Sequence, residues 1–582
     1  MNGEFQVSGQ NENALFTLKV HRGDGMALLA MNWKQGLPPK DFVGFAIDYR
    51  EPGGSKFFPL KNRLAFPNPD GSVNSATLPT TLSPIQKFRW VHFPRNAELD
   101  GDFIYRVTPV FMSATDELSY GEAQQVAIEL RRETYPGQLN VTFTRGFVSS
   151  QAFVDKYGKD ANGKDAIPTL LPKKSDEGLD FVPTHPKAAE ALAWMGFEAR
   201  SAILEVLDQA IADPTAQVRA VLYDLSEPGV VSRLQKLKDR LKIIIDDDGA
   251  HGEEESGETK AAERLRLTAG PDRVKRLHLG KLQHNKTVVV DGEKVQAAIC
   301  CSTNHSWRGF FVQNNNAIIL RGKEPVKLFQ AAFKHYWEAE NSVANFRATT
   351  SARWNKLGLA GIDAKISFSP RAKNDAVLAS IAADIANNTT SCLFFSLAFL
   401  YQTPGPIQNA VKKIQEDDLV FTYGISDHKL KNFEETEGVD IAKPDGKVKT
   451  VYSAALAKNV PKPFSEEPIG GNGTRMHHKF VVIDFDKPTA RVYVGSYNFS
   501  NAADVSNGEN LLLIKDRRIA VSYVVEAVRL FDHYHFRVVQ QEAKKARKVL
   551  QLAKPPRKAG EKPWWAEDYT VPRKVLDREL FA

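Results

Sequence analysis

The chain of 582 residues is 42% hydrophobic and 25% charged, a composition that excludes a disordered or fibrous protein and predicts several folded domains. Its 77 Lys and Arg residues and 70 Asp and Glu residues give a net charge of +7, which excludes a uniformly basic nucleic-acid coat. Three cysteines without metal-ligand spacing argue against a disulfide framework and predict a reducing compartment. No signal sequence or membrane-spanning stretch is recognisable, so we expect a cytoplasmic protein.

Residues 1–132 contain six short runs of strand-like composition, separated by turn residues. The runs lie at 16–20, 26–33, 42–49, 87–93, 102–111 and 123–130. This spacing predicts an all-β sandwich. The third and fifth runs resemble the middle and late strands of a fibronectin type III domain, with Tyr105 as the candidate corner tyrosine. We expect this domain to be a spacer or to bind a protein partner that the sequence does not identify.

From residue 133 to residue 540 strand and helix patterns alternate, and the same order occurs twice. Residues 133–345 predict strands at 140–145, 220–225 and 241–246 and helices at 190–211 and 231–240. Residues 346–540 predict strands at 365–369, 391–399 and 419–424 and helices at 376–385 and 407–414. Such a repeat predicts two tandem α/β domains, with mixed sheets flanked by helices and related by a pseudo-twofold axis. A basic C-terminal tail, residues 541–582, follows.

Each α/β half carries the same polar cassette. In the first half His284, Lys286 and Asp291 lie in the sequence HNKTVVVD; 193 residues later, His477, Lys479 and Asp484 lie in HHKFVVID. Each H-x-K-x4-D pattern is followed at matched spacing by S-x-N and by one further polar residue. These residues are Ser302, Asn304 and Asn315 in the first half and Ser496, Asn498 and Glu509 in the second. Two copies with matched trailing residues predict one functional site.

The residue types of this cassette suit attack on a phosphodiester. Each H-x-K begins a strand-like run, and residues two apart on a strand share a face. One imidazole can attack phosphorus to form a phosphohistidine while the other protonates the leaving oxygen, after which the roles reverse to activate water. Lys286, Lys479, Asn304 and Asn498 would hold the non-bridging oxygens. Because two ammonium groups supply the positive charge, we expect no metal and no cofactor.

These motifs resemble those of the phospholipase D superfamily, whose signature is H-x-K-x4-D followed by G-S-x-N. The resemblance covers about residues 133–540 and implies a phosphohistidine mechanism that uses His284, Lys286, Asn304, His477, Lys479 and Asn498. It implies mainly structural roles for Asp291 and Asp484 and supporting roles for Ser302 and Ser496. The second cassette, including Glu509, is also similar to small bacterial nucleases of the superfamily. One departure is Cys301, which occupies the first glycine position and could crowd the turn there.

The two cassettes differ at one aligned position, where the second has Glu509 and the first has Asn315. A carboxylate bonded to an imidazole raises its pKa, whereas an amide orients the ring without adding charge. We therefore expect Glu509 to hold His477 protonated, as the acid. Neutral His284, held by Asn315 or Gln313, is then the nucleophile, which agrees with a resemblance to tyrosyl-DNA phosphodiesterases.

The substrate is less determined by the sequence than the reaction. The nearly neutral body and an apolar loop at 452–464 favour a phospholipid headgroup ester. A nuclease remains an alternative because the stretch 258–286 is basic, and a catalytically inactive binding module is a third. The segments 246–280 and 425–475 are the expected rims of the site. The basic run 544–548 could contact a membrane surface or nucleic acid, and Trp564 and Trp565 are expected to dock the tail.

Overall fold

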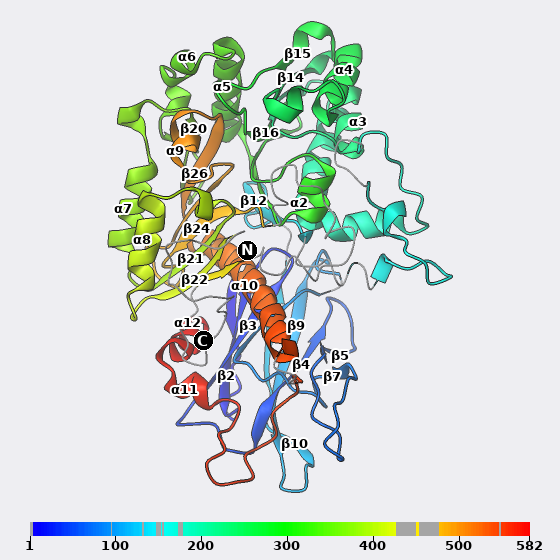
Figure 1. The fold of residues 1–582 in the computed structure, drawn as a ribbon, viewed down its shortest axis with the longest axis vertical. Coiled ribbons are helices and arrows are strands. Elements are labelled where there is room, and N and C mark those ends of the chain that lie inside the picture. Colours follow the sequence, from blue (N-terminus) through cyan, green and yellow to red (C-terminus); the bar gives the residue numbers. More distant parts are fainter. Residues whose placement is uncertain are drawn as a thin grey trace. The chain divides into compact units, whose positions relative to one another are not determined.

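The computed structural model describes residues 4–94, 96–130, 133–146, 153, 156–172, 178–426, 450–452, 476–545 and 549–582. The chain forms two compact units (Figure 1). The first combines the N-terminal residues, as far as 130, with residues from 521 to the C-terminus. The second contains the described residues between 133 and 520. Both copies of the polar cassette therefore belong to the second unit.

The N-terminal region of the first unit is all-β, as its short alternating runs predict. One antiparallel sheet has the order β1 (Gln6–Ser8), β2 (Phe16–Arg22), β3 (Ala27–Trp33) and β8 (Arg89–His92). The other has the order β10 (Leu118–Tyr120), β9 (Asp102–Met112), β4 (Phe42–Arg50) and β5 (Phe58–Pro59), with β11 (Gln124–Glu129) also paired to β9. A small third sheet pairs β6 (Lys61–Asn62) with β7 (Leu78–Pro79). Phe16 and Leu29 from the first sheet share one core with Phe45 and Tyr105 from the second.

The C-terminal segment packs on this sandwich, as the two tryptophans predict. It contains α11 (Ala566–Thr570) and α12 (Pro572–Phe581). The Trp564 indole N–H donates to the Phe42 carbonyl at 3.0 Å, and Trp564 stacks on Phe88 at 5.3 Å between ring centroids. Trp565 is buried in the same core. The side chains of the basic run 544–548 lie outside the described residues.

The second unit contains two mixed sheets with matching strand orders. The first is β12 (Leu139–Phe143), β18 (Asn316–Arg321), β17 (Gln296–Cys301), β16 (Lys286–Asp291), β13 (Gln217–Leu222), β14 (Leu241–Ile245) and β15 (Val274–Arg276). The second is β19 (Asn355–Lys356), β20 (Asp363–Ser369), β26 (Glu509–Lys515), β25 (Arg491–Gly495), β24 (Lys479–Ile483), β21 (Cys392–Leu397), β22 (Phe421–Ser426) and β23 (Thr450–Tyr452). From β12 and β20 onward the strands correspond one to one, so the predicted tandem mixed α/β arrangement is present.

Helices flank each sheet. Those of the first half are α2 (Ala188–Ala212), α3 (Pro228–Lys236), α4 (Gly257–Ala269), α5 (Lys323–Ala339) and α6 (Val343–Arg347). Those that follow are α7 (Leu378–Asn388), α8 (Pro406–Gln415) and α9 (Asn501–Val505). The next helix, α10 (Arg517–Lys545), belongs from Val521 onward to the first unit. No helix in the described part of the chain has both the length and the apolar character to cross a bilayer.

One helix, α4, lies within the segment 246–280, which showed no clear periodicity in the sequence. The Ser256 hydroxyl caps it by accepting from the Thr259 amide at 3.1 Å. Its buried stripe contains the small residues Ala261 and Ala262, so the hydrophobic signal is weak. The other expected rim, 425–475, lies mostly outside the described residues.

Candidate active site

The two histidines of the cassette meet within the second unit. His284 and His477 each immediately precede a central strand segment, and all residues of β24 and most of β16 are buried. Their β-branched and aromatic runs fit a strand that is covered on both faces. The two imidazole centroids lie 6.5 Å apart, and each histidine is only 4% exposed. This proximity of residues 193 positions apart is what the internal repeat predicts.

Each lysine lies beside its own histidine. Lys286 Nζ donates to the His284 carbonyl at 2.5 Å, and Lys479 Nζ donates to the His477 carbonyl at 2.9 Å. Burial lowers the pKa of Lys286 to about 7, despite the opposing charge of Glu509, and lowers the pKa of Lys479 well below its ordinary value. An anion between them would restore both charges, so the geometry and electrostatics favour an anionic ligand.

An aromatic ring flanks each lysine. The Lys286 ammonium lies 4.5 Å from the Tyr223 ring centroid, and the Lys479 ammonium lies 5.5 Å from that of Phe399. Both rings also contact the neighbouring histidine, Tyr223 at 4.6 Å from His284 and Phe399 at 6.0 Å from His477. The sequence reasoning missed these two residues. Their only signal is their position just after β13 and β21, beside the strands that carry the motifs.

The partners of the histidines cross between the halves, which corrects the sequence-based assignment. His284 Nδ1 lies 2.8 Å from Glu509 Oε2, and His477 Nδ1 lies 2.8 Å from Asn315 Oδ1. The expectation that Glu509 holds His477 and that Asn315 or Gln313 holds His284 is therefore wrong. The expectation assumed that each histidine pairs with a residue of its own cassette. Instead, Asn315, just before β18, and Glu509, at the start of β26, each contact the histidine of the other half.

The crossed pairing places different charges beside the two histidines and so affects their pKa values differently. Burial lowers the pKa of His284 to about 4, with the Glu509 carboxylate opposing the effect. Burial lowers the pKa of His477 well below its ordinary value, and the charges of Lys479 and Lys286 lower it further. Burial disfavours the charge of Glu509, but His284 and Lys286 outweigh it and lower the pKa of that carboxyl.

The residues next in sequence also cross between the halves. Asn510 Nδ2 donates to Asn285 Oδ1 at 3.0 Å, and Asn316 Nδ2 lies 3.1 Å from His478 Nδ1. Asn285 and His478 are the middle residues of the two H-x-K patterns. Each half therefore fixes two consecutive residues of the other half. The aligned Asn316 and Asn510 were the sequence signal for this role.

The serines and asparagines of S-x-N occupy different environments. The Ser302 and Ser496 hydroxyls accept from the Asn316 and Asn510 amides, both at 3.0 Å, which fits their expected supporting role. The side-chain oxygens of Asn304 and Asn498 are buried without a hydrogen-bond partner in the described part of the chain. A buried amide in this state is available to a bound polar group.

The structure does not bring Asp291 and Asp484 to the site. Asp291 accepts from Gln330 Nε2 at 2.8 Å at the far end of β16. Asp484, just beyond β24, accepts backbone N–H groups from residues 390–392. Both side chains make hydrogen bonds at the ends of strands, away from the two histidines.

Cys301 has a positive φ of 96°, a conformation that favours glycine. Its amide nevertheless donates to Asn510 Oδ1 at 3.3 Å, so the backbone of the first cassette still reaches the other half. The equivalent Gly495 has no room for a side chain, because a Cβ there would lie 2.1 Å from the Asn510 carbonyl oxygen. The departure at Cys301 is thus accommodated in the first half by local strain.

Comparisons with known proteins found similarity over the α/β part of the chain. Residues 207–337 and 397–530 match the family model described as cardiolipin synthase, PLD-like domain. A curated phospholipase D from Rickettsia felis is 46% identical over 48 residues. These matches indicate that the chain is similar to proteins of the phospholipase D superfamily. The Rickettsia match covers 8% of this chain and only 22% of that relative.

Two solved structures were also found to be similar. A phosphatidylserine synthase from Haemophilus influenzae is 13% identical, with a TM-score of 0.40 over 60% of this chain and 92% of that chain. Nuc, a phospholipase D family member from Salmonella typhimurium, is 21% identical, with a TM-score of 0.20 over 24% of this chain and 86% of that chain.

Proposed function

We propose that this protein is a phospholipase D-type phosphodiesterase with one composite active site. The observation that carries this proposal is the 6.5 Å separation of the His284 and His477 rings, each with its Nδ1 already bonded to a side chain of the other half. Engagement of Nδ1 leaves Nε2 of each ring for chemistry. Two such nitrogens on either side of a phosphoryl group can serve as nucleophile and acid.

The reaction proceeds in two displacements at phosphorus. His284 Nε2 attacks, a phosphorus–nitrogen bond forms, and the bond to the leaving oxygen breaks as His477 Nε2 protonates that oxygen. His477 takes up this proton when the anionic phosphoryl group lies beside it and offsets the charges of Lys479 and Lys286. Water then enters, His477 takes a proton from it, and its oxygen attacks phosphorus. The phosphorus–nitrogen bond breaks, and its electron pair returns to His284. Lys286, Lys479, Asn304 and Asn498 hold the non-bridging oxygens throughout.

The position of Glu509 supports His284 as the nucleophile. Attack through Nε2 makes the His284 ring cationic, and this charge persists through the phosphohistidine. A buried carboxylate 2.8 Å from Nδ1 stabilises that developing charge. The acid must instead lose a proton, and a neutral amide behind His477 does not oppose this loss. The resemblance to tyrosyl-DNA phosphodiesterases, in which an amide lies behind the attacking histidine, now favours the opposite assignment, because the amide lies behind His477. Trapping of the intermediate in His477→Asn decides between the two assignments.

The walls of the site favour an amphiphilic phosphodiester over a nucleic acid. On the first-half side, carboxyl groups gather beyond β13 and β14. They are Asp224, Asp246, Asp247, Asp248 and Glu258. Asp246 is buried and paired with His251, and burial raises the pKa of Glu258 to about 8, so the negative charge that a substrate would meet comes from Asp224, Asp247 and Asp248. On the second-half side the equivalent position carries Phe399. Neighbouring phosphates of a nucleic acid would be repelled by the acidic wall, whereas a phospholipid carries one phosphodiester with a headgroup on one side and apolar chains on the other.

The discriminating experiment supplies the purified chain with phospholipid vesicles and with single-stranded and double-stranded DNA. We expect release of a headgroup alcohol from vesicles, with little cleavage of DNA. Cleavage of DNA without lipid turnover would establish the nuclease alternative, and full activity of His284→Asn would overturn the proposed site. Adding a second alcohol tests transfer as well as hydrolysis, since the matched family model is described as a cardiolipin synthase.

For the N-terminal part of the chain, we propose that residues 1–132 form a fibronectin type III-like domain. The order β2-β3-β8 in one sheet and β5-β4-β9 in the other supports this likeness. Residues 133–345 and 346–540 are proposed as the two catalytic halves. The sandwich would bind a protein partner, which affinity capture with the isolated wild-type chain and mass spectrometry can identify.

A further inference from the structure

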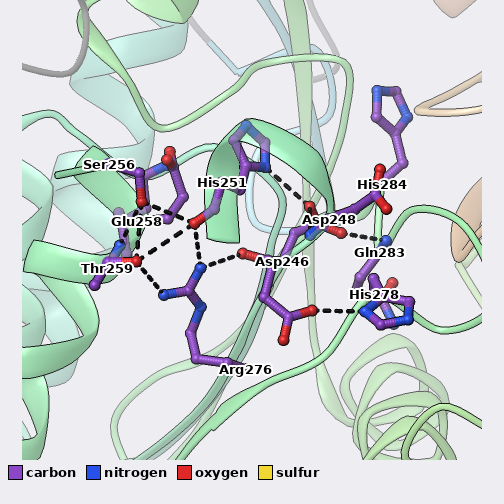
Figure 2. Close-up of polar contacts among 12 residues, drawn as sticks. Asp246, Asp248, His251, Ser256, Glu258, Thr259, Arg276, His278, Gln283 and His284 are labelled. Atoms are coloured by element: carbon purple, nitrogen blue, oxygen red, sulfur yellow. Dashed lines mark hydrogen bonds and ion pairs between the residues drawn. The ribbon is translucent and has the colours of Figure 1, made fainter. Parts of the chain in front are cut away.

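A second group of ionisable side chains lies beside His284 (Figure 2). It is built from the end of β14, the segment that leads into α4, and the residue before His284. Asp246, His251 and Arg276 are hydrogen-bonded to one another in this group. The proposed reaction uses none of them directly. Their contacts converge on His284 by two routes.

The first route runs through the backbone. Asp246 is fully buried, and its Oδ1 accepts from the Gln283 amide at 2.6 Å. Gln283 immediately precedes His284, so this bond fixes the chain where the nucleophilic histidine begins. Asp246 Oδ2 accepts from the Asp248 amide at 3.1 Å and lies 2.9 Å from His251 Nδ1. One carboxylate therefore holds three separate groups in fixed positions.

The second route runs through aromatic rings. The His251 ring lies 4.4 Å from the Tyr223 ring, and the Tyr223 ring lies 4.6 Å from the His284 ring, both in edge contacts. The Lys286 ammonium also lies 4.5 Å from the centroid of the Tyr223 ring. Since Asp246 orients His251, it also affects how Tyr223 packs against His284 and Lys286.

The charge of His251 strengthens this arrangement. Burial alone would lower its pKa, but the hydrogen bond to Asp246 and the nearby charges of Glu258 and Asp224 raise it to about 9. At neutral pH an imidazolium therefore faces the buried Asp246 carboxylate. Arg276 Nη2 adds a bond to the Asp246 carbonyl at 3.0 Å and another to the His251 carbonyl at 2.5 Å.

In the second half the ring beside the motif histidine is Phe399, one position further along the chain than the equivalent of Tyr223. Leu222 pairs with Lys286 and Leu397 pairs with Lys479, so Tyr223 and Asp224 correspond to Ala398 and Phe399. Among the described residues, a tyrosine ring that lies between two imidazoles occurs in the first half only.

We propose that Asp246 is a positioning residue for His284, acting through the Gln283 amide on the backbone and through His251 and Tyr223 on the ring. This inference rests on the proposed function, in which His284 attacks phosphorus. Asp246 touches neither the substrate nor the reacting atoms. Its contribution is the placement of Nε2, and small misplacements of a nucleophile are costly to the rate.

The test compares Asp246→Ala and Asp246→Asn with the same two changes at Asp213. Asp213 is a matched control because its buried carboxylate accepts from the Thr215 amide at 3.0 Å and the Lys294 amide at 2.8 Å. It lies before the other end of β13, away from His284. His251→Gln provides a third variant that leaves the Gln283 bond intact if the Asp246 variants do not fold.

For Asp246→Ala we expect the single-turnover rate of phosphohistidine formation to fall about tenfold or more, with KM nearly unchanged. Asp246→Asn should lose less, because its amide oxygen still accepts from the Gln283 amide. Asp213 variants should melt at a lower temperature yet retain the wild-type rate well below that temperature. Equal losses at Asp246 and Asp213, or no loss at Asp246, would overturn the proposal.

A second measurement does not depend on turnover. The Nδ1 proton shared by His284 and Glu509 should give a downfield proton resonance, assigned by its absence in His284→Asn. We expect Asp246→Ala and His251→Gln to shift or broaden it, and Asp213→Ala to leave it unchanged. An unchanged resonance in both Asp246→Ala and His251→Gln contradicts the positioning role. Absence of wild-type turnover on any substrate would instead contradict the proposed function.

Discussion

The Glu509 carboxylate lies 2.8 Å from Nδ1 of His284, although 225 residues separate them in sequence. Both groups are almost completely inaccessible to solvent, so the contact is a buried charge-assisted hydrogen bond between the two halves. Its counterpart joins Asn315 to His477 at the same distance. The two histidines therefore share a geometry but differ in the charge behind the ring.

Exchanging these partners should separate the roles of the histidines. Glu509→Gln retains an acceptor for Nδ1 but removes the charge that stabilises a cationic His284 ring, so we expect phosphohistidine formation to slow at least about tenfold. The reverse change, Asn315→Asp, should hold the proton on His477 and slow departure of poor leaving groups most. Rapid-quench kinetics with substrates of graded leaving-group pKa measures both effects. Equal effects on all leaving groups would contradict the assignment.

His477→Asn should trap the covalent intermediate. The variant cannot activate water, but a substrate with a good leaving group needs little protonation, so phosphate should accumulate on His284. Mass spectrometry of the quenched protein identifies the labelled histidine, and His284→Asn is the matched control. Phosphate on His477 of the control protein would reverse the roles.

Turnover should not depend on a divalent cation. Lys286 and Lys479 lie beside both histidines and would be charged once an anion lies between them, and no cluster of three metal-ligating side chains occurs among the described residues. We expect a chelator to leave the rate unchanged and vanadate, a phosphoryl mimic, to inhibit. Loss of turnover in chelator that a divalent ion restores would refute this prediction.

The stability of the fold should depend on the protonation of His284. Its native pKa is about 4 and its ordinary value is 6.5, so between these pH values only the unfolded chain binds the proton. The free energy of unfolding should therefore fall as the pH drops from about 6.5 toward 4. His284→Asn should reduce this fall by about 2 kcal/mol between pH 7 and pH 5 in urea titrations. Equal pH dependence in both proteins would contradict the prediction, and His185→Asn is the control.

A buried ion pair in the second half should matter more than an exposed one. Arg371 Nη1 lies 2.8 Å from Asp504 Oδ1, with both side chains almost fully buried. Asp504→Ala leaves the guanidinium uncompensated and should cost about 3–5 kcal/mol in free energy of unfolding. Asp363, paired with Lys515 in an exposed position, provides the comparison, and Asp363→Ala should cost about 1 kcal/mol or less. Similar costs for the two variants would refute the argument.

The sequence alone predicted most of the strands and helices and the pairing of the two His-Lys motifs in one site. Alternation of apolar residues identified β9, and a short β-branched and aromatic run identified β24, because both signals are local. The repeated cassette predicted that one site contains His284, Lys286, His477 and Lys479, because equal spacing on equivalent strands implies equivalent positions. The matching strand order of the two sheets agrees with that repeat. The helix α4 escaped detection because its buried stripe is made largely of small residues.

Only the tertiary structure decided which groups touch. Glu509 reaches His284, and Asn510 reaches Asn285, because the ends of the central strands of two separate sheets meet, and this relationship leaves no trace in the spacing of either cassette. The contacts of Tyr223 and Asp246 with His284 and Gln283 likewise depend on how loops at the ends of neighbouring strands fold back. Residue types thus fixed the available chemistry, whereas packing between distant segments set the charge and orientation of each reacting ring.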